Sequence, residues 1–294
     1  AHYGADFVQM LNGMFAIAIW NMESQVLHIF RDRMGIKPLY FYWDKKHFAF
    51  ASELKSIQQL KEKIDLSINK TAVNEFLHLG YIPEPHSIYN EVQKLPSGSH
   101  LKISENDFEI KAYWEINEQV KSNVISDPAE AKEQLKELLF SSVKYRMISD
   151  VPYGTFLSGG IDSSTVTAIS QQISSEPIKT FTVRFEDSKF NEADFAKKVA
   201  EHLQTDHHEY TVTEKDAIAL VDKMMDAYDE PYSDSSAIPT MLVSKMAREN
   251  VTMTLSGDGG DELFFGYGSY QWAKRLNNPF VKAFRKPIGM GLSQ

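Results

Sequence analysis

A serine- and glycine-rich loop at residues 157–163, with the sequence Leu-Ser-Gly-Gly-Ile-Asp-Ser, most strongly constrains how this chain can fold. It follows an apolar run typical of a β-strand and precedes one typical of an α-helix. Where a strand passes through such a loop into a helix, the first backbone N–H groups of the helix are unpaired and the helix dipole favours negative charge. The sequence therefore predicts a strand–loop–helix pocket for a polyanion.

The residue types in this loop fit a nucleotide. Gly159 and Gly160 let the backbone approach phosphate oxygens, and the hydroxyls of Ser158 and Ser163 add donors. Asp162 is acidic where anions should bind, so we expect it to hold Mg²⁺ that bridges the phosphates. No Gly-Lys-Ser/Thr follows, as it would in the commoner phosphate loop, and the three spaced glycines of a dinucleotide-binding turn are missing. The loop resembles the Ser-Gly-Gly-x-Asp-Ser loop of the N-type ATP pyrophosphatases; a glycine-rich turn without a ligand is the alternative.

The first half of the chain has the pattern of an antiparallel sheet. Short apolar runs are joined by polar turns, and this spacing predicts hairpins. The expected strands cover 15–20, 26–30, 39–43, 48–51 and 100–103. Residues 81–100 hold three prolines and a glycine and predict an irregular connector.

The second half alternates helix and strand. Asp127, Pro128 and Glu130 predict a helix start, and helical spacing then follows over residues 135–147. Further helices are expected at 166–173, 195–203, 218–228 and 238–247, and strands at 181–185 and 251–255. This alternation predicts a doubly wound parallel sheet, with ligands at the carboxyl ends of its strands. We expect two domains, residues 1–118 and 119–294.

A second glycine-rich loop, residues 256–262, follows the last predicted strand. Because two such loops in a parallel sheet can face one crevice, Asp261 is a natural second carboxylate for Mg²⁺ beside Asp162. Asp258 is then free for chemistry near a reacting carbonyl group. The alternative is an acidic surface turn or a Ca²⁺ site, although the ligand spacing of an EF-hand is missing.

The composition of the chain excludes several classes of function and partner. The chain has 294 residues, a net charge of −9 and no cysteine. The acidic balance argues against nucleic acid or an anionic membrane as partner, and no apolar run approaches the roughly 18 residues of a membrane span. We expect a cytoplasmic protein without disulfides or thiolate metal sites. The start at Ala1 and the basic end predict a piece of a longer protein.

With both loops, the chain resembles the glutamine-dependent asparagine synthetases. Residues 11–16 (Leu-Asn-Gly-Met-Phe-Ala) and 31–40 (Arg-Asp-Arg-Met-Gly-Ile-Lys-Pro-Leu-Tyr) resemble the end of that family's class II glutaminase domain. The resemblance implies a catalytic Asp258 and the metal ligands Asp162 and Asp261. The residues that it implies for ATP binding are Leu157, Ser158, Gly159, Gly160, Ile161, Asp162, Ser163, Val183, Ser256 and Gly257.

The resemblance also implies a reaction. Aspartate would react with ATP to give β-aspartyl-AMP and pyrophosphate, and ammonia from glutamine would then displace AMP. The family's nucleophile is an N-terminal cysteine, which this chain lacks, so we assign no glutaminase catalytic residue. Arg31, Asp32 and Gly35 are interpreted as structural. We expect the full-length protein to act on small molecules and to form a homodimer, and the 294-residue piece to be inactive.

Other interpretations stay open. The loops bind ATP rather than the acceptor, so the acceptor could be a sugar carboxylate or another metabolite. A nucleotide-binding regulator without turnover is a further alternative. His202, His207 and His208 have the wrong spacing for a metal site. Residues 229–236 are kept as a substrate-side candidate.

Overall fold

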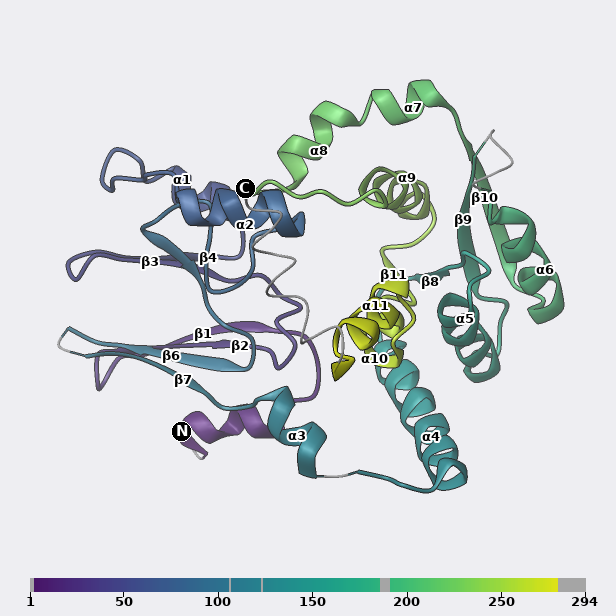
Figure 1. Ribbon diagram of the computed structural model, residues 1–294, viewed down its shortest axis with the longest axis horizontal. Coiled ribbons are helices and arrows are strands. Elements are labelled where there is room, and N and C mark those ends of the chain that lie inside the picture. The colour runs from purple at the N-terminus through teal and green to yellow at the C-terminus, as the bar shows by residue number, and fades with distance from the viewer. Residues whose placement is uncertain (1–2, 106, 123, 186–190, 280–294) are drawn as a thin grey trace. The chain divides into compact units, whose positions relative to one another are not determined.

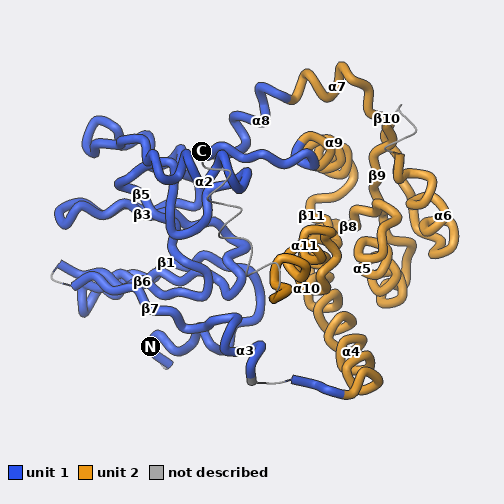
Figure 2. Tube along the Cα trace, viewed as in Figure 1, with its two compact units in different colours: residues 1–126, 221–237 blue, residues 127–220, 238–294 orange. Residues whose placement is uncertain are grey.

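The computed structural model describes residues 3–105, 107–122, 124–185 and 191–279 (Figure 1). By its contacts the chain divides into two compact units, which Figure 2 shows in blue and orange. Unit 1 holds residues 1–126 and 221–237, and unit 2 holds residues 127–220 and 238–294. The second segment of unit 1 is thus flanked on both sides by unit 2 sequence.

Unit 1 contains two antiparallel sheets, as the strand pattern predicted. The larger sheet has the order β1-β2-β6-β7 and the smaller has the order β4-β3-β5. The strands are β1 (Ala16–Asn21), β2 (Val26–Arg31), β3 (Tyr40–Trp43), β4 (Phe48–Ala51), β5 (Val92–Lys94), β6 (Ser99–Ile103) and β7 (Phe108–Ala112). A core that includes Ile29, Phe41 and Leu101 joins the two sheets.

Helices cover the other face of the smaller sheet. Side chains alternate along a strand, so Phe41 faces the larger sheet whereas Tyr40 and Tyr42 pack with Leu54 and Ile57 of α1. The helices of unit 1 are the 3₁₀ helix η1 (Gly4–Met10), α1 (Leu54–Gln58), α2 (Lys70–Leu79), α3 (Ile116–Ser122) and α8 (Val221–Ala227). The described part of the unit therefore has a sheet–sheet–helix layering (Figure 1).

Unit 2 contains the parallel sheet that the alternating pattern predicted. Its strand order is β10-β9-β8-β11, and all three pairings are parallel. The strands are β8 (Tyr153–Phe156), β9 (Lys179–Phe185), β10 (Asp206–Val212) and β11 (Met253–Leu255). The helices are α4 (Pro128–Arg146), α5 (Ile161–Ile173), α6 (Ala193–Leu203), α7 (Glu214–Ile218), α9 (Ala237–Arg248), α10 (Gly260–Phe264) and α11 (Gly268–Leu276).

Helices lie on both faces of this sheet. Phe156 and Phe181 pack against α9, whereas Thr155 contacts Thr167 of α5 and Leu157 packs against α6. Because successive residues of a strand face opposite sides, α5 and α6 share one face and α9 covers the other. The doubly wound sheet is confirmed.

Three local predictions need correction. The connector at 81–100 contains the strand β5, and β7 was not predicted. The helix expected at 218–228 is divided into α7 and α8, and Ile218 is 70% exposed. In α4 the predicted apolar face holds only near its C-terminal end, because Leu138 is 66% exposed whereas Val143 is buried. No helix in the described ranges has the length and apolarity to cross a membrane.

Candidate nucleotide-binding site

The two glycine-rich loops lie side by side in unit 2, because they follow neighbouring strands. β8 leads into residues 157–160, β11 leads into residues 256–259, and these two strands pair in parallel. From β8 the chain proceeds outward through β9 to β10 and then returns to β11 on the other side of β8. The loops therefore flank the topological switch point of the sheet, where ligands bind in open α/β folds.

Hydrogen bonds within the first loop fix its shape. The Oγ atoms of Ser158 and Ser163 are 2.9 Å apart, and the backbone N–H of Ser158 donates to Ser163 Oγ over 3.2 Å. The N–H of Gly160 donates to Ser158 Oγ, also over 3.2 Å. Gly160 is the N-cap of α5, and no side chain caps this helix end. The first turn of α5 thus presents backbone N–H groups beside two hydroxyl groups, which suits an anion.

Gly159 is required by its conformation and by its neighbours. Its φ is +82°, a region that favours glycine, and a Cβ there would lie 2.6 Å from the backbone nitrogen of Ala196. The loop can therefore pack directly on the start of α6. Leu157, which precedes it, is buried against Ala196 and Ala200. Ile161, by contrast, is 85% exposed at the start of α5.

The second loop has its own internal contacts. Ser256 Oγ donates to Asp258 Oδ2 over 2.9 Å, and the N–H of Gly260 donates to the carbonyl oxygen of Gly257 over 3.2 Å. Gly259 has a φ of +92° and is the N-cap of α10. Asp258 is exposed, so its carboxylate is accessible to a ligand.

The two loops are in contact through glycines. A Cβ on Gly257 would lie 2.6 Å from the backbone nitrogen of Ser163 and 3.0 Å from Asp162 Cβ. A Cβ on Gly260 would collide with the Asp162 carboxylate. The acidic side chain of the first loop therefore lies directly against the residue that precedes Asp261. Both predicted metal-binding residues belong to one region of unit 2.

The donor set fits a hard divalent cation that also binds phosphates. Mg²⁺ in nucleotide sites is commonly held by one or two carboxylates together with phosphate oxygens. Asp162 adjoins Gly260, and the Asp261 side chain lies against Gly266. Within the described ranges, no three or more His, Asp or Glu side chains are grouped so that they could hold a metal ion.

Val183 occupies a different position from the loops. It is half-buried in β9 and packs against apolar side chains on the face covered by α9. These contacts account for its side chain, and its role in ATP binding stays a prediction.

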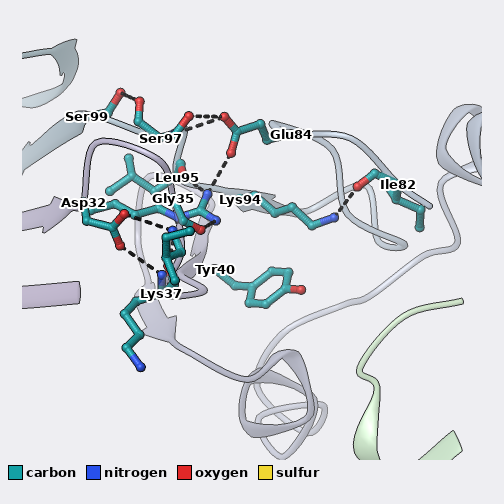
Figure 3. A network of polar contacts seen from close by, with 12 residues as sticks. Asp32, Gly35, Lys37, Tyr40, Ile82, Glu84, Lys94, Leu95, Ser97 and Ser99 are labelled. Carbon is teal, nitrogen blue, oxygen red and sulfur yellow. Dashed lines mark hydrogen bonds and ion pairs between the residues drawn. The ribbon is translucent and has the colours of Figure 1, made fainter. Parts of the chain in front are cut away.

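Hydrogen bonds within unit 1 hold the side chains of Arg31 and Asp32 in place. Arg31 is 8% exposed and donates to three carbonyl oxygens, those of Gly35, Lys37 and Leu95, and to the Glu84 carboxylate over 2.8 Å (Figure 3). Asp32 is 1% exposed and accepts the backbone N–H groups of Phe15, Ile36 and Lys37. Gly35 has a φ of +64° in the turn between Asp32 and Ile36.

Two features of the site were not predicted. Thr155 of β8 and Thr167 of α5 are fully buried, with their Oγ1 atoms 2.9 Å apart below the first loop. Gly266 lies against the Asp261 side chain, and its N–H donates to the Asp261 carbonyl oxygen over 2.9 Å. Its sequence context is Phe-Phe-Gly-Tyr-Gly at 264–268, which is compatible with both a mobile cover and ordinary packing.

Residues 229–236, the substrate-side candidate, belong to unit 1. Their first two carboxylates already have protein partners there. Asp229 accepts the N–H of Leu54, and Glu230 pairs with Lys94, so we do not assign these two residues to substrate binding.

The layered antiparallel sheets of unit 1 and the doubly wound sheet of unit 2 define a protein with an amidotransferase-type first unit and an ATP pyrophosphatase-type second unit. Comparison with known families supports this class. The glutamine amidotransferase domain family matches residues 1–114, and the asparagine synthase family matches residues 134–289. The chain belongs to the asparagine synthase family.

Curated relatives agree. A Methanocaldococcus jannaschii protein provisionally named asparagine synthetase (glutamine-hydrolyzing) 2 is 43% identical over 96% of this chain and 55% of its own length. Asparagine synthetase (glutamine-hydrolyzing) 1 of Bacillus subtilis is 35% identical over 92% of this chain and 42% of its own. Asparagine synthetase B of Escherichia coli is 30% identical over 98% of this chain and 49% of its own length. The chain spans about half the length of these relatives.

Proposed function

We propose that the full-length protein containing this chain is a glutamine-dependent asparagine synthetase. It would convert aspartate, ATP, glutamine and water into asparagine, glutamate, AMP and pyrophosphate. The family membership and the names of the relatives support this activity. The observation that carries the site assignment is the packing of Gly257 and Gly260 against Asp162, which joins the two loops into one anion-binding region.

In the first step, a side-chain carboxylate oxygen of aspartate attacks the α-phosphorus of ATP. The bond from that phosphorus to pyrophosphate breaks, which gives β-aspartyl-AMP. The backbone N–H groups at the start of α5, with the hydroxyls of Ser158 and Ser163, would hold the departing pyrophosphate. Asp162 and Asp261 would hold Mg²⁺, which when bound neutralises phosphate charge. Ser256 and Gly257 would contact the nucleotide.

In the second step, the nitrogen of ammonia attacks the acyl carbon of β-aspartyl-AMP, the bond to AMP breaks and nitrogen loses a proton. We assign Asp258 to the formation of the adenylate, because its exposed carboxylate lies beside the nucleotide loop and is oriented by Ser256 Oγ. Catalysis of this kind consists largely of positioning and charge neutralisation. The proposal also includes a cytoplasmic location and a homodimer, both of which stay predictions.

Aspartate-dependent release of pyrophosphate from ATP tests the function. The full-length protein should release pyrophosphate with aspartate and form asparagine when ammonia or glutamine is added. Asp162→Asn should lower adenylation at least about 100-fold, since it removes metal charge from the phosphates. Asp150→Asn is the control, because Asp150 is exposed before β8 at the opposite end of the strand. Release with a sugar carboxylate and none with aspartate would contradict the proposed acceptor.

A further inference from the structure

Residues 221–237 lie within the part of the chain that matches the asparagine synthase family, yet they belong by contact to unit 1. The chain enters unit 1 after Leu220 and leaves it after Ala237. Unit 1 otherwise consists of residues 1–126, most of which match the glutamine amidotransferase family. A segment of synthase sequence is therefore built into the amidotransferase unit.

Asp229 attaches this segment to α1. Its Oδ2 accepts the backbone N–H of Leu54, the first residue of the helix, over 2.5 Å. Glu53, the N-cap of α1, makes no side-chain cap, so Asp229 supplies one from 175 positions away in the sequence. Lys55 Nζ lies 3.6 Å from Asp229 Oδ1, and the Asp229 side chain is 11% exposed.

Glu230 attaches the same segment to unit 1 through more contacts than Asp229 does. Its Oε1 accepts the backbone N–H of Ile88 over 2.7 Å, and its Oε2 lies 2.6 Å from Lys94 Nζ. Tyr40 also donates its hydroxyl to Glu230 Oε2 over 3.3 Å. The side chains of Glu230 and Lys94 are only 10% and 15% exposed. A nearly buried ion pair of this kind is costly to break from one side, because the remaining charge loses its partner.

The partners of Glu230 form part of a cavity wall. Tyr40 and Lys94, together with Arg31 and Glu84, line a cavity of about 350 Å³ inside unit 1. Lys94 also donates to the carbonyl oxygen of Ile82 over 2.6 Å, which fixes its direction in the wall (Figure 3). The positions of these two wall residues thus depend on a carboxylate from the synthase sequence.

We propose that Asp229 and Glu230 form a clasp that couples glutamine hydrolysis to asparagine formation, with Glu230 as the positioning residue. This inference rests on the proposed function. Ammonia is lost to solvent unless the unit that releases it stays connected to the unit that uses it. The clasp connects them, because it fixes a segment whose two ends continue into unit 2 to the cavity wall of unit 1.

Glu230→Gln in the full-length protein tests the clasp, because it keeps the shape and the Ile88 contact but removes the charge that pairs with Lys94. We expect the number of glutamines hydrolysed per asparagine formed to rise about fivefold or more, as for other coupling between sites. Asparagine formation from added ammonium should stay within about twofold of wild type, since this route needs no transfer. Glu249→Gln, an exposed position on the C-terminal side of α9, is the control.

Lys94→Met removes the same ion pair from the other side and should raise the ratio similarly. It keeps the test decisive if Glu230→Gln fails to fold. An unchanged ratio in a folded variant would overturn the clasp, as would an equal loss of the ammonium-driven reaction, which would make Glu230 a substrate-side residue. A wild-type protein that forms no asparagine even from ammonium would instead overturn the proposed function, and with it the transfer role.

Discussion

Gly257 packs directly on Ser163, with only 2.6 Å between the backbone nitrogen of Ser163 and the place where a Cβ on Gly257 would lie. A side chain at residue 257 would therefore separate the two loops. We expect Gly257→Ala to weaken ATP binding at least about tenfold and to cost about 1–3 kcal/mol of stability. Calorimetric titration of ATP and urea unfolding measure the two effects.

Gly268→Ala is a matched control for this change. Gly268 begins α11, and a Cβ there would meet nothing within 4 Å. The substitution should leave ATP binding unchanged and slightly stabilise the chain, since alanine restricts the unfolded state. Equal ATP affinity in the Gly257→Ala variant and the control would contradict the role of the loop contact.

The buried Asp32 carboxylate should be a major stabilising group of unit 1. It accepts three backbone N–H groups while only 1% exposed. We expect Asp32→Asn to lower the free energy of unfolding by about 2–4 kcal/mol, because an amide nitrogen would face backbone donors. Asp107→Asn, which removes an exposed ion pair with Lys102, should cost at most about 1 kcal/mol. Similar losses for both variants in urea unfolding would refute this assignment.

Stability should depend on pH through His28 and His100, whose rings are stacked with Nδ1 of His28 2.9 Å from Nε2 of His100. Burial, with the nearby His28, lowers the pKa of His100 to about 4. Between pH 6.5 and pH 4 the unfolded chain therefore binds more protons at His100 than the folded chain does. The stability that the neutral His100 ring contributes is present above pH 6.5 and is lost as the pH falls toward 4. We expect a loss of about 2 kcal/mol, allowing for partial exposure.

Urea unfolding between pH 7 and pH 4 measures this dependence. His100→Phe should reduce the slope over this range, because it removes the group whose pKa is lowered. His78→Phe is the control at an exposed histidine on α2. A slope that survives His100→Phe unchanged would assign the pH dependence to other groups.

A disulfide can report whether the clasp is closed. A Cβ on Gly80 would lie 3.6 Å from Ser233 Cβ, within the range for a disulfide. The chain has no cysteine, so Gly80→Cys with Ser233→Cys introduces the only two thiols in it. We expect rapid cross-linking under mild oxidation, although the φ of +80° at residue 80 adds about 1 kcal/mol of strain.

Glu230→Gln should slow this cross-linking, because the segment would spend more time released from unit 1. The rate is followed as a mobility shift on non-reducing gels. An identical rate with and without Glu230→Gln would show that the ion pair does not hold the segment. The Gly80→Cys variant alone, oxidised under the same conditions, controls for intermolecular disulfides.

The adjacency of the two loops was predictable because its signals are local. The strand, the glycine loop and the helix start around residue 158 are contiguous, and the parallel sheet then brings the loop at 256–262 beside it. The position of Gly266 beside Asp261 was not predictable, since aromatic residues next to a glycine are typical of both packing and covers.

The placement of residues 221–237 could not be predicted for a physical reason. Glu230 is stabilised by Tyr40, Ile88 and Lys94, all more than 130 positions away, and no periodicity within the segment records those partners. The strand β5 was missed for a similar reason. Its three residues lie among prolines, and they form a strand because β3 offers an unpaired edge.

The insertion of residues 221–237 into unit 1 has a consequence for synthesis on the ribosome. The last described strand of unit 1, β7, ends at residue 112, yet the cap on α1 and the partner of Lys94 follow more than a hundred residues later. The nascent unit 1 therefore lacks these contacts until residues 127–220 of unit 2 and the segment 221–237 have been translated. Unit 1 can therefore reach its final stability only after part of unit 2 has been synthesised.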